Sequence, residues 1–194
     1  VALADLGADV GQTALVSTRM FVFIRAINTG GRRLTNDELL APFRVAGLDQ
    51  VEAYQAAGNV TFVSDRTTDE LAHELRERLS AAYGFEAPVF LRTVDELTTR
   101  TAMSPFPADE LAATEGRVQI TFMADQPTAT QIGEVLTLVP SEDTVTFVGR
   151  EWFWLPRAGV SASSLPVSRI EQIVGPMTMR TLGTVERMLR RFGD

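Results

Sequence analysis

The chain has 194 residues, of which 45% are hydrophobic, and its 25 acidic against 18 basic residues give a formal net charge of −7. This length and composition predict one globular domain or two small halves that share a core, and the acidic balance argues against loose electrostatic binding to nucleic acid. The chain has no cysteine and all 18 basic residues are arginine, which excludes disulfides, thiolate nucleophiles, zinc–cysteine sites and Schiff-base lysines.

The first half reads as alternating strands and helices. Residues 1–19 show neither strand alternation nor a helical stripe, and we expect a poorly ordered N-terminal tail there. Four Asp-Glu-Leu triplets predict helix starts rather than paired catalytic carboxylates, because acidic residues in a first turn offset the helix dipole. Gly58 fits a hairpin turn that needs positive φ, and Gly47 and Gly84 fit helix ends. The predicted elements are strand 20–26, helix 36–46, strand 50–56, strand 59–64, helix 68–83, strand 88–92 and helix 94–101.

The second half is predicted to repeat most of this topology. Residues 102–116 contain two prolines and a glycine and are predicted to be a linker. Trp152 and Trp154 alternate with Phe153 on one strand, which favours core or interface packing over base stacking. We find no residue-level repeat and expect a helix in place of the last strand. The predicted elements are strand 117–123, helix 128–138, strand 143–148, strand 151–156, helix 166–174 and a final helix near 181–192.

The order of these elements predicts the fold class. A βαββαβ order is that of the ferredoxin-like unit, an antiparallel sheet with two helices on one face. We therefore predict an α+β fold of two ferredoxin-like (βαββαβ-type) subdomains packed together. The predicted division is a tail over 1–19, an N-terminal subdomain over 20–101, a linker over 102–116 and a C-terminal subdomain over 117–194.

Two stretches place positive charge and backbone amides where a strand meets a helix start, an arrangement suited to an anion. In the first, an apolar strand carrying Arg25 runs into Asn28, Gly30 and Gly31; in the second, Asn59 follows the hairpin glycine. Arg25 must either pair with a carboxylate in the core or point into a cleft, because a buried unpaired guanidinium is very costly. Asn28 could instead cap its own turn, and the glycines could simply supply positive φ. Neither a dinucleotide fingerprint nor a P-loop is present.

Three motifs in order resemble a bacterial family known as domain of unknown function 1697. The first motif is matched by Arg25, Ile27, Asn28, Gly30 and Gly31. The hairpin motif is matched by Tyr54, Gly58, Asn59, Val60 and Phe62. The C-terminal motif is matched by Thr178, Arg180, Thr184 and Val185.

The chain also departs from the family pattern. The departures are Ala26, Ala56, Ala57, Thr181 and Leu182, where the family has glycine, glutamine, serine, asparagine and tryptophan. The resemblance extends from about Phe21 to the end and implies two ferredoxin-like subdomains. It implies no activity, because none is established for the family. If a family site depends on the replaced polar side chains, this member binds differently or not at all.

The function stays open among three classes. The first is a binding protein for a small anion, a nucleotide or a phosphorylated metabolite. The second is an interaction or scaffold module, in which the same polar residues lock the halves together and the tryptophan strand meets a partner. The third and least favoured is a hydrolase or transferase that uses a carboxylate and arginines. The candidate ligand-binding residues are Arg25, Asn28, Gly30, Gly31, Arg32, Asn59 and Arg180.

The position of the arginines discriminates the first two classes. A ligand site needs Arg25 and Arg180 exposed in one cleft, whereas a scaffold needs them buried and paired. The single histidine, His73, falls on the polar side of the helix over 68–83, so we expect a solvated side chain and no triad or multi-histidine metal site. No catalytic residue, cofactor or metal is assigned. With no membrane-span-length apolar run, we expect a soluble cytoplasmic bacterial protein, a monomer or homodimer.

Overall fold

The computed structural model describes residues 17–25, 27, 33–55, 57–103, 105–114 and 117–193. In the first half the strands are β1 (Thr18–Ile24), β2 (Asp49–Ala53), β3 (Asn59–Ser64) and β4 (Val89–Thr93), and the helices are α1 (Asn36–Val45), α2 (Thr68–Tyr83) and α3 (Val94–Ala102). A short helix, α4 (Ala108–Ala112), follows. In the second half the strands are β5 (Gln119–Met123), β6 (Thr144–Val148), β7 (Glu151–Leu155) and β8 (Met177–Thr181), and the helices are α5 (Ala129–Thr137), α6 (Val167–Val174) and α7 (Leu182–Phe192).

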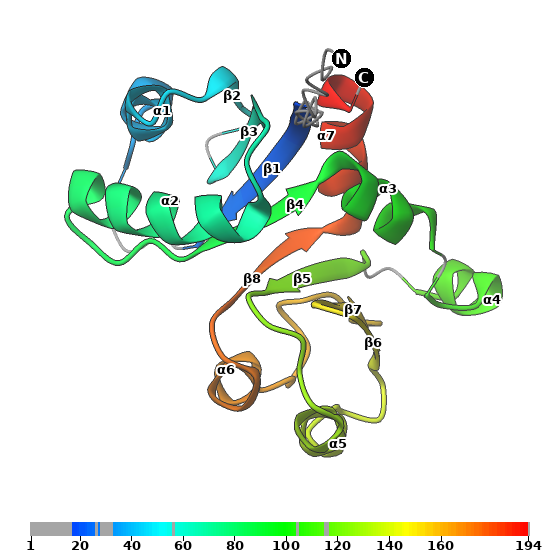
Figure 1. Ribbon diagram of the computed structural model, residues 1–194. Coiled ribbons are helices and arrows are strands. Elements are labelled where there is room, and N and C mark those ends of the chain that lie inside the picture. The colour runs from blue at the N-terminus through cyan, green and yellow to red at the C-terminus, as the bar shows by residue number, and fades with distance from the viewer. Residues whose placement is uncertain are drawn as a thin grey trace, which may run out of the picture.

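These elements form two four-stranded antiparallel sheets (Figure 1). The strand orders are β2-β3-β1-β4 and β6-β7-β5-β8, so the two halves have the same topology, βαββαβ followed by one more helix. The predicted α+β fold with two ferredoxin-like halves is confirmed. No described helix is long and apolar enough to span a membrane.

The structure differs from the predicted elements in three details. The chain forms strand β8 between α6 and α7, where we expected no strand, and β8 pairs with β5 at the sheet edge. Helix α4 lies inside the stretch 102–116 that we predicted to be a linker. Strand β1 begins at Thr18, inside the predicted tail over 1–19, because Thr18 and Arg19 extend the pairing with β3. The subdomain boundaries at 101 and 117 stay a prediction, and most of the tail lies outside the described residues.

The helices begin where short polar sequences satisfy their first amides. In α1, α2 and α3 a threonine caps the helix and a glutamate three residues later reaches back to the threonine backbone, which forms a capping box. Helix α5 has the same box with Gln131 in the glutamate position. The Asp-Glu-Leu triplets therefore do mark helix starts. The cap of α2 is Thr67, the residue directly before the helix.

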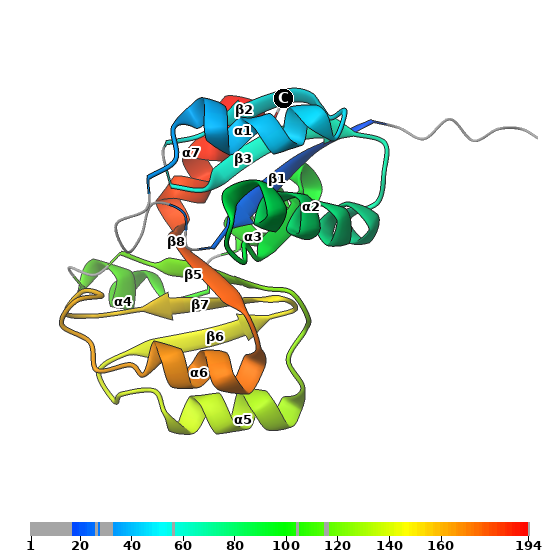
Figure 2. The ribbon, with the colours of Figure 1, turned by 90° about the vertical axis from the view of Figure 1, so that its left-hand side faces the viewer.

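Helices cover the outer face of each sheet (Figure 2), and side chains of the two inner faces share a core. Helices α1 and α2 pack on the first sheet, and α5 and α6 on the second. Between the sheets lies a cluster of side chains from β1, β4, β5, β7, α3 and α7. At its centre the rings of Phe23 and Phe122 stack with centroids 4.0 Å apart. Trp152 and Trp154 are buried on the outer face of β7, which confirms core packing and leaves no tryptophan strand for a partner.

The two halves also correspond residue by residue at this core, although the sequence alone suggested no such repeat. Strand β1 pairs Phe21 with Arg92 of β4, and β5 pairs Ile120 with Arg180 of β8. Arg92 and Arg180 therefore occupy equivalent edge-strand positions, each followed by a threonine and a helix. By the same register Phe23 is equivalent to Phe122. The stacked rings thus lie where a pseudo-two-fold axis relates the halves.

Candidate functional site

Arg92 of the first half is a buried link to the second half. Its Nε donates to a carboxylate oxygen of Glu151, and its Nη2 donates to the backbone oxygens of Met123 at 2.9 Å and Arg150 at 3.2 Å. The other oxygen of Glu151 accepts from Nε of Arg100 at 2.6 Å. Both members of the Arg92–Glu151 pair are almost completely buried. Two arginines therefore balance one buried carboxylate at this end of the interface.

Arg180 makes the equivalent link in the opposite direction. Its Nε donates to Oδ1 of Asn59 at 2.6 Å, and its Nη2 donates to the backbone oxygens of Ile24 and Ala57, both at 3.0 Å. Nη1 donates to Thr178 Oγ1 and to the Met179 carbonyl. All of its N–H groups are therefore engaged. Each arginine also lies over a phenylalanine of the opposite half, Arg92 over Phe122 and Arg180 over Phe23.

The two ends of the interface differ in charge. Asn59 begins β3 where the equivalent residue of β7 is Glu151, so a neutral amide stands in the place of a buried carboxylate. The first turn of α3 carries Asp95 and Glu96, whereas the equivalent positions of α7 are Gly183 and Thr184. The positions that carry carboxylates at the α3 end thus carry neutral residues at the α7 end. The arginine is present at both ends, as Arg92 and as Arg180.

Arg180 is buried without a described carboxylate partner, and this burial lowers the pKa of its guanidinium. Desolvation lowers the pKa of its guanidinium to about 10. Desolvation also lowers the pKa of Arg92, but the nearby Glu151 opposes that shift. No described carboxylate forms an ion pair with Arg180. Arg180 is therefore buried without a described carboxylate partner, unlike Arg92, which pairs with Glu151.

Beside Arg180, at the junction of β8 and α7, the surface has a hollow of about 420 Å³. Arg117 and Arg187 both line it, and neither pairs with a described carboxylate. Arg187 donates from Nε to the Tyr54 hydroxyl at 3.3 Å and from Nη2 to Thr184 at 3.1 Å. The hollow is lined by Arg117, Val118, Thr181, Leu182, Gly183, Glu186 and Arg187.

Helix α7 begins at this hollow without the threonine cap of α1, α2, α3 and α5, and α6 also lacks a side-chain cap. Thr181 precedes the helix, but its side chain caps no backbone amide and instead bonds the Thr184 hydroxyl at 2.7 Å. First-turn amides that lack an intrahelical partner favour anions, through both hydrogen bonding and the helix dipole. The backbone thus adds to the positive field of the two arginines.

The structure places the predicted site residues in different environments. Asn59 is fully buried, and its Nδ2 donates to the Tyr54 carbonyl while Oδ1 accepts from Arg180. The hairpin and C-terminal motifs therefore meet in space. Arg25 instead pairs with Glu171 of α6, with Nη2 and Oε2 at 2.8 Å, and its side chain is 42% exposed. The arginines Arg25 and Arg180 thus bind different partners and do not share the hollow at α7.

Four of the predicted binding residues, Asn28, Gly30, Gly31 and Arg32, lie outside the described residues, and their role stays a prediction. The sequence analysis did not single out Arg117 or Arg187. For Arg187 a signal existed, because it lies three residues after the motif residue Thr184 and therefore on the same helix face. Arg117 has no local pattern that could have pointed to it.

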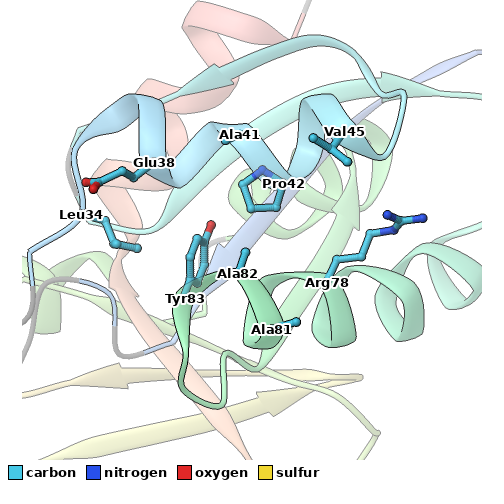
Figure 3. A pocket seen from close by; sticks show the side chains of 9 residues that line it. All are labelled: Leu34, Glu38, Ala41, Pro42, Val45, Arg78, Ala81, Ala82 and Tyr83. Atoms are coloured by element: carbon cyan, nitrogen blue, oxygen red, sulfur yellow. The ribbon is translucent and has the colours of Figure 1, made fainter.

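A second, larger hollow of about 690 Å³ lies between α1 and α2 (Figure 3). Its lining is mostly apolar, with Pro42 and Val45 on one helix and Ala82 and Tyr83 on the other. The Tyr83 hydroxyl is engaged, because it donates to the Leu39 carbonyl at 2.7 Å. The hollow therefore suits an apolar partner better than a small anion.

The residues that the structure describes offer no obvious metal centre. Among them, no group of three His, Asp or Glu side chains is arranged to hold a metal ion. His73 lies on the outer side of α2 with its side chain 80% exposed, 3.6 Å from Glu77. It is the solvated surface histidine that the helix pattern predicted.

Comparison with known proteins bears on the fold. Residues 17–153 match the model of a family described as protein of unknown function (DUF1697). The solved structure of the conserved bacterial protein SP0830 from Streptococcus pneumoniae is similar, with a TM-score of 0.74 at 22% sequence identity; the match covers 91% of this chain and 99% of that chain. At this identity the likeness shows the fold alone. No curated protein matches the chain.

Proposed function

Because this chain belongs to the DUF1697 family of proteins of unknown function, we propose a function from its own site: it binds a small anionic ligand in the hollow between Arg117 and Arg187. The ligand's anionic group would accept hydrogen bonds from the two guanidinium groups and from the Gly183 and Thr184 amides of α7, because the Leu182 N–H already donates to the Val118 carbonyl. Arginine suits this role because its planar fork of N–H groups matches phosphate and carboxylate oxygens.

The observation that carries the proposal is the charge difference between the two ends of the interface. At the α3 end Glu96 closes the first turn, with its Oε2 accepting from the Thr93 N–H at 2.9 Å, and also pairs with Arg150 at 2.8 Å. At the α7 end no described carboxylate does either of these things. A ligand anion at α7 would therefore supply the negative charge that the chain itself supplies at α3.

The lining of the hollow narrows the ligand class. The hollow is about 420 Å³ and has no aromatic residue in its lining, so no base-stacking surface supports a nucleotide. A short phosphorylated or carboxylated metabolite fits better. In this proposal Arg180 and Asn59 have a positioning role, because they hold the hairpin with Tyr54 against the end of β8 and the start of α7.

The experiment is calorimetric titration of the full chain with inorganic phosphate. The parent should bind with a saturable heat, and Arg117→Gln and Arg187→Gln should each weaken binding by about tenfold, since each removes one charge-assisted contact. Arg190→Gln is the matched control, because it removes one exposed arginine from the same helix outside the hollow, and it should stay within about twofold of the parent. A parent without saturable heat, or a control as weak as the other two variants, would overturn the proposal.

A second candidate function is an interaction module, and the groove between α1 and α2 favours it. Val45 at the rim of this groove is 77% exposed, which is unusual for a valine on an otherwise amphipathic helix. An apolar helix of a partner protein would bury this side chain. Val45→Glu should abolish such an association in a pull-down and leave phosphate binding unchanged. If Val45→Glu leaves the association intact and weakens phosphate binding, the groove is not the docking site.

A further inference from the structure

We infer that the ligand of the α7 hollow is a small zwitterion, with an ammonium group joined to its anionic group by a short chain; this inference rests on the proposed function. Its basis is a carboxylate that the anion site alone does not require. Glu186 lines the same hollow as Arg117 and Arg187, and it forms no ion pair with a described arginine. A hollow meant only for an anion would gain nothing from this negative charge.

The spacing of α7 brings both charges to one place. Gly183, Glu186 and Arg187 are at positions i, i+3 and i+4, which share a helix face. A Cβ added to Gly183 would lie 3.4 Å from Nη1 of Arg187 and 4.0 Å from Oε2 of Glu186. The two head groups therefore converge over the glycine, at a separation that one small molecule can bridge.

Arg187 and Glu186 form no ion pair, and Arg187 instead contacts two neutral hydroxyl groups. Arg187 donates to the Tyr54 hydroxyl and to Thr184, so its guanidinium is directed toward the hairpin and the start of the helix. Glu186 hydrogen-bonds to neither the Tyr54 hydroxyl nor Thr184. An acceptor for a ligand ammonium thus lies beside donors for a ligand anion, and neither group is used up by the other.

Gly183 lines the hollow without a side chain, so a ligand can approach the backbone of α7 closely there. Its φ is not in the left-handed region, so the backbone does not require glycine there. Glycine inside a helix destabilises by about 0.5–1 kcal/mol relative to alanine. The missing side chain leaves the space between Arg187 and Glu186 open, and the apolar side chains of Val118 and Leu182 border it. Such a lining suits the short methylene chain between the two charges of a zwitterion.

The test compares two phosphate esters that differ only in one group, 2-aminoethyl phosphate and 2-hydroxyethyl phosphate. By calorimetry the parent should bind the amino ester about fivefold more tightly, the upper range for a partly exposed ion pair. Glu186→Gln should reduce this preference to within about twofold and leave the hydroxy ester bound as well as before. Glu142→Gln, an exposed glutamate outside the hollow, is the matched control and should keep the preference. A parallel titration with β-alanine distinguishes a carboxylate from a phosphate as the anionic group.

The outcomes distinguish failure of the zwitterion inference from failure of the proposed anion binding. Equal binding of the two esters by the parent, or equal weakening of both by Glu186→Gln, overturns the zwitterion and leaves anion binding intact. If neither ester nor β-alanine binds the parent, the proposed function fails as well. A preference for any ammonium-bearing probe that Glu186→Gln abolishes supports the inference.

Discussion

At the scale of single residues, Glu151 is the side chain on which the interface depends most. It is buried between Arg92 and Arg100 and accepts from both. Glu151→Gln would leave two guanidinium groups against a neutral amide. Because breaking a buried pair leaves an uncompensated charge, we expect a loss of about 3–5 kcal/mol in the free energy of unfolding, measured with urea.

Glu96→Gln is the control for this prediction. Glu96 pairs with Arg150, but both side chains are about one-third exposed, and glutamine can keep the capping box. We expect a loss of about 1 kcal/mol or less. Equal losses for the two variants would show that burial of the Glu151 pair is not what stabilises the interface.

Gly58 is fixed by both backbone conformation and space. Its φ is +70°, and a Cβ there would lie 2.7 Å from the Ile24 carbonyl oxygen. Gly84 has nearly the same φ, +71°, but a Cβ there would meet nothing within 4 Å. We expect Gly84→Ala to cost about 1 kcal/mol from conformation alone and Gly58→Ala clearly more, about 2 kcal/mol or above. Thermal unfolding of both variants measures the difference, and similar melting temperatures would contradict the close approach.

The sequence predicted that Arg25 would either pair or line a cleft, and it could not decide between them. The deciding partner, Glu171, lies 146 residues away on α6. Such a pairing depends on how the two halves pack, which no local pattern encodes. For the same reason the hollow could not be predicted: Arg117 and Arg187 come from different ends of the second half and meet only after β5 and β8 have paired.

At the scale of elements, the capping boxes couple helix stability to pH. The Thr67 hydroxyl and backbone N–H donate to Glu70, and these bonds lower the pKa of its carboxyl below 4.5. A lowered folded-state pKa means that the carboxylate stabilises the fold above pH 4.5 and that this contribution is lost as the pH falls through the folded value.

We therefore expect Glu70→Gln to flatten the loss of stability with acid. Glutamine can accept the same bonds without titrating, as Gln131 does in α5. The midpoint of urea unfolding should be close to that of the parent at pH 7 and should fall less between pH 4.5 and pH 3. Glu70→Ala has no acceptor and should lower the midpoint at every pH. An acid dependence unchanged in Glu70→Gln would rule out this linkage.

Element order could be predicted because helix starts and hairpin turns carry local signals. The Asp-Glu-Leu triplets and the turn glycines predicted the first half almost as it is found. Strand β8 was missed because Met-Thr-Met-Arg-Thr lacks the Val-Phe-Leu run that marks the equivalent strand β4. The side chain of Arg180 contacts the opposite half rather than solvent. The usual alternation of buried apolar and exposed polar side chains along an edge strand therefore does not appear in this sequence.

At the scale of the whole molecule, the shared core predicts that the halves unfold together. Phe23 of the first half stacks on Phe122 of the second, and α3 and α7 pack beside them. Both tryptophans of the chain lie in β7, so tryptophan fluorescence reports on the second half only. Phe23→Leu removes an aromatic pair and should cost about 1–2 kcal/mol.

The test is whether the unfolding midpoints measured by two spectroscopic signals shift by the same amount. Far-UV circular dichroism reports on both halves, and we expect its midpoint and that of tryptophan fluorescence to shift by the same amount in Phe23→Leu. A fluorescence midpoint that stays at the parent value would show that the second half unfolds independently, and the interface would then not unite the molecule.

The binding site itself is tested most directly by NMR, with a ¹H–¹⁵N titration of the full chain by inorganic phosphate. The amides of Gly183 and Thr184 lie in the first turn of α7, where the anion is proposed to bind. We predict that these two amides show the largest shifts and that they saturate with one dissociation constant, together with the Nε–H signals of Arg117 and Arg187. Shifts that do not saturate, or that are spread evenly over exposed arginines such as Arg76 and Arg169, would contradict a built anion site at this junction.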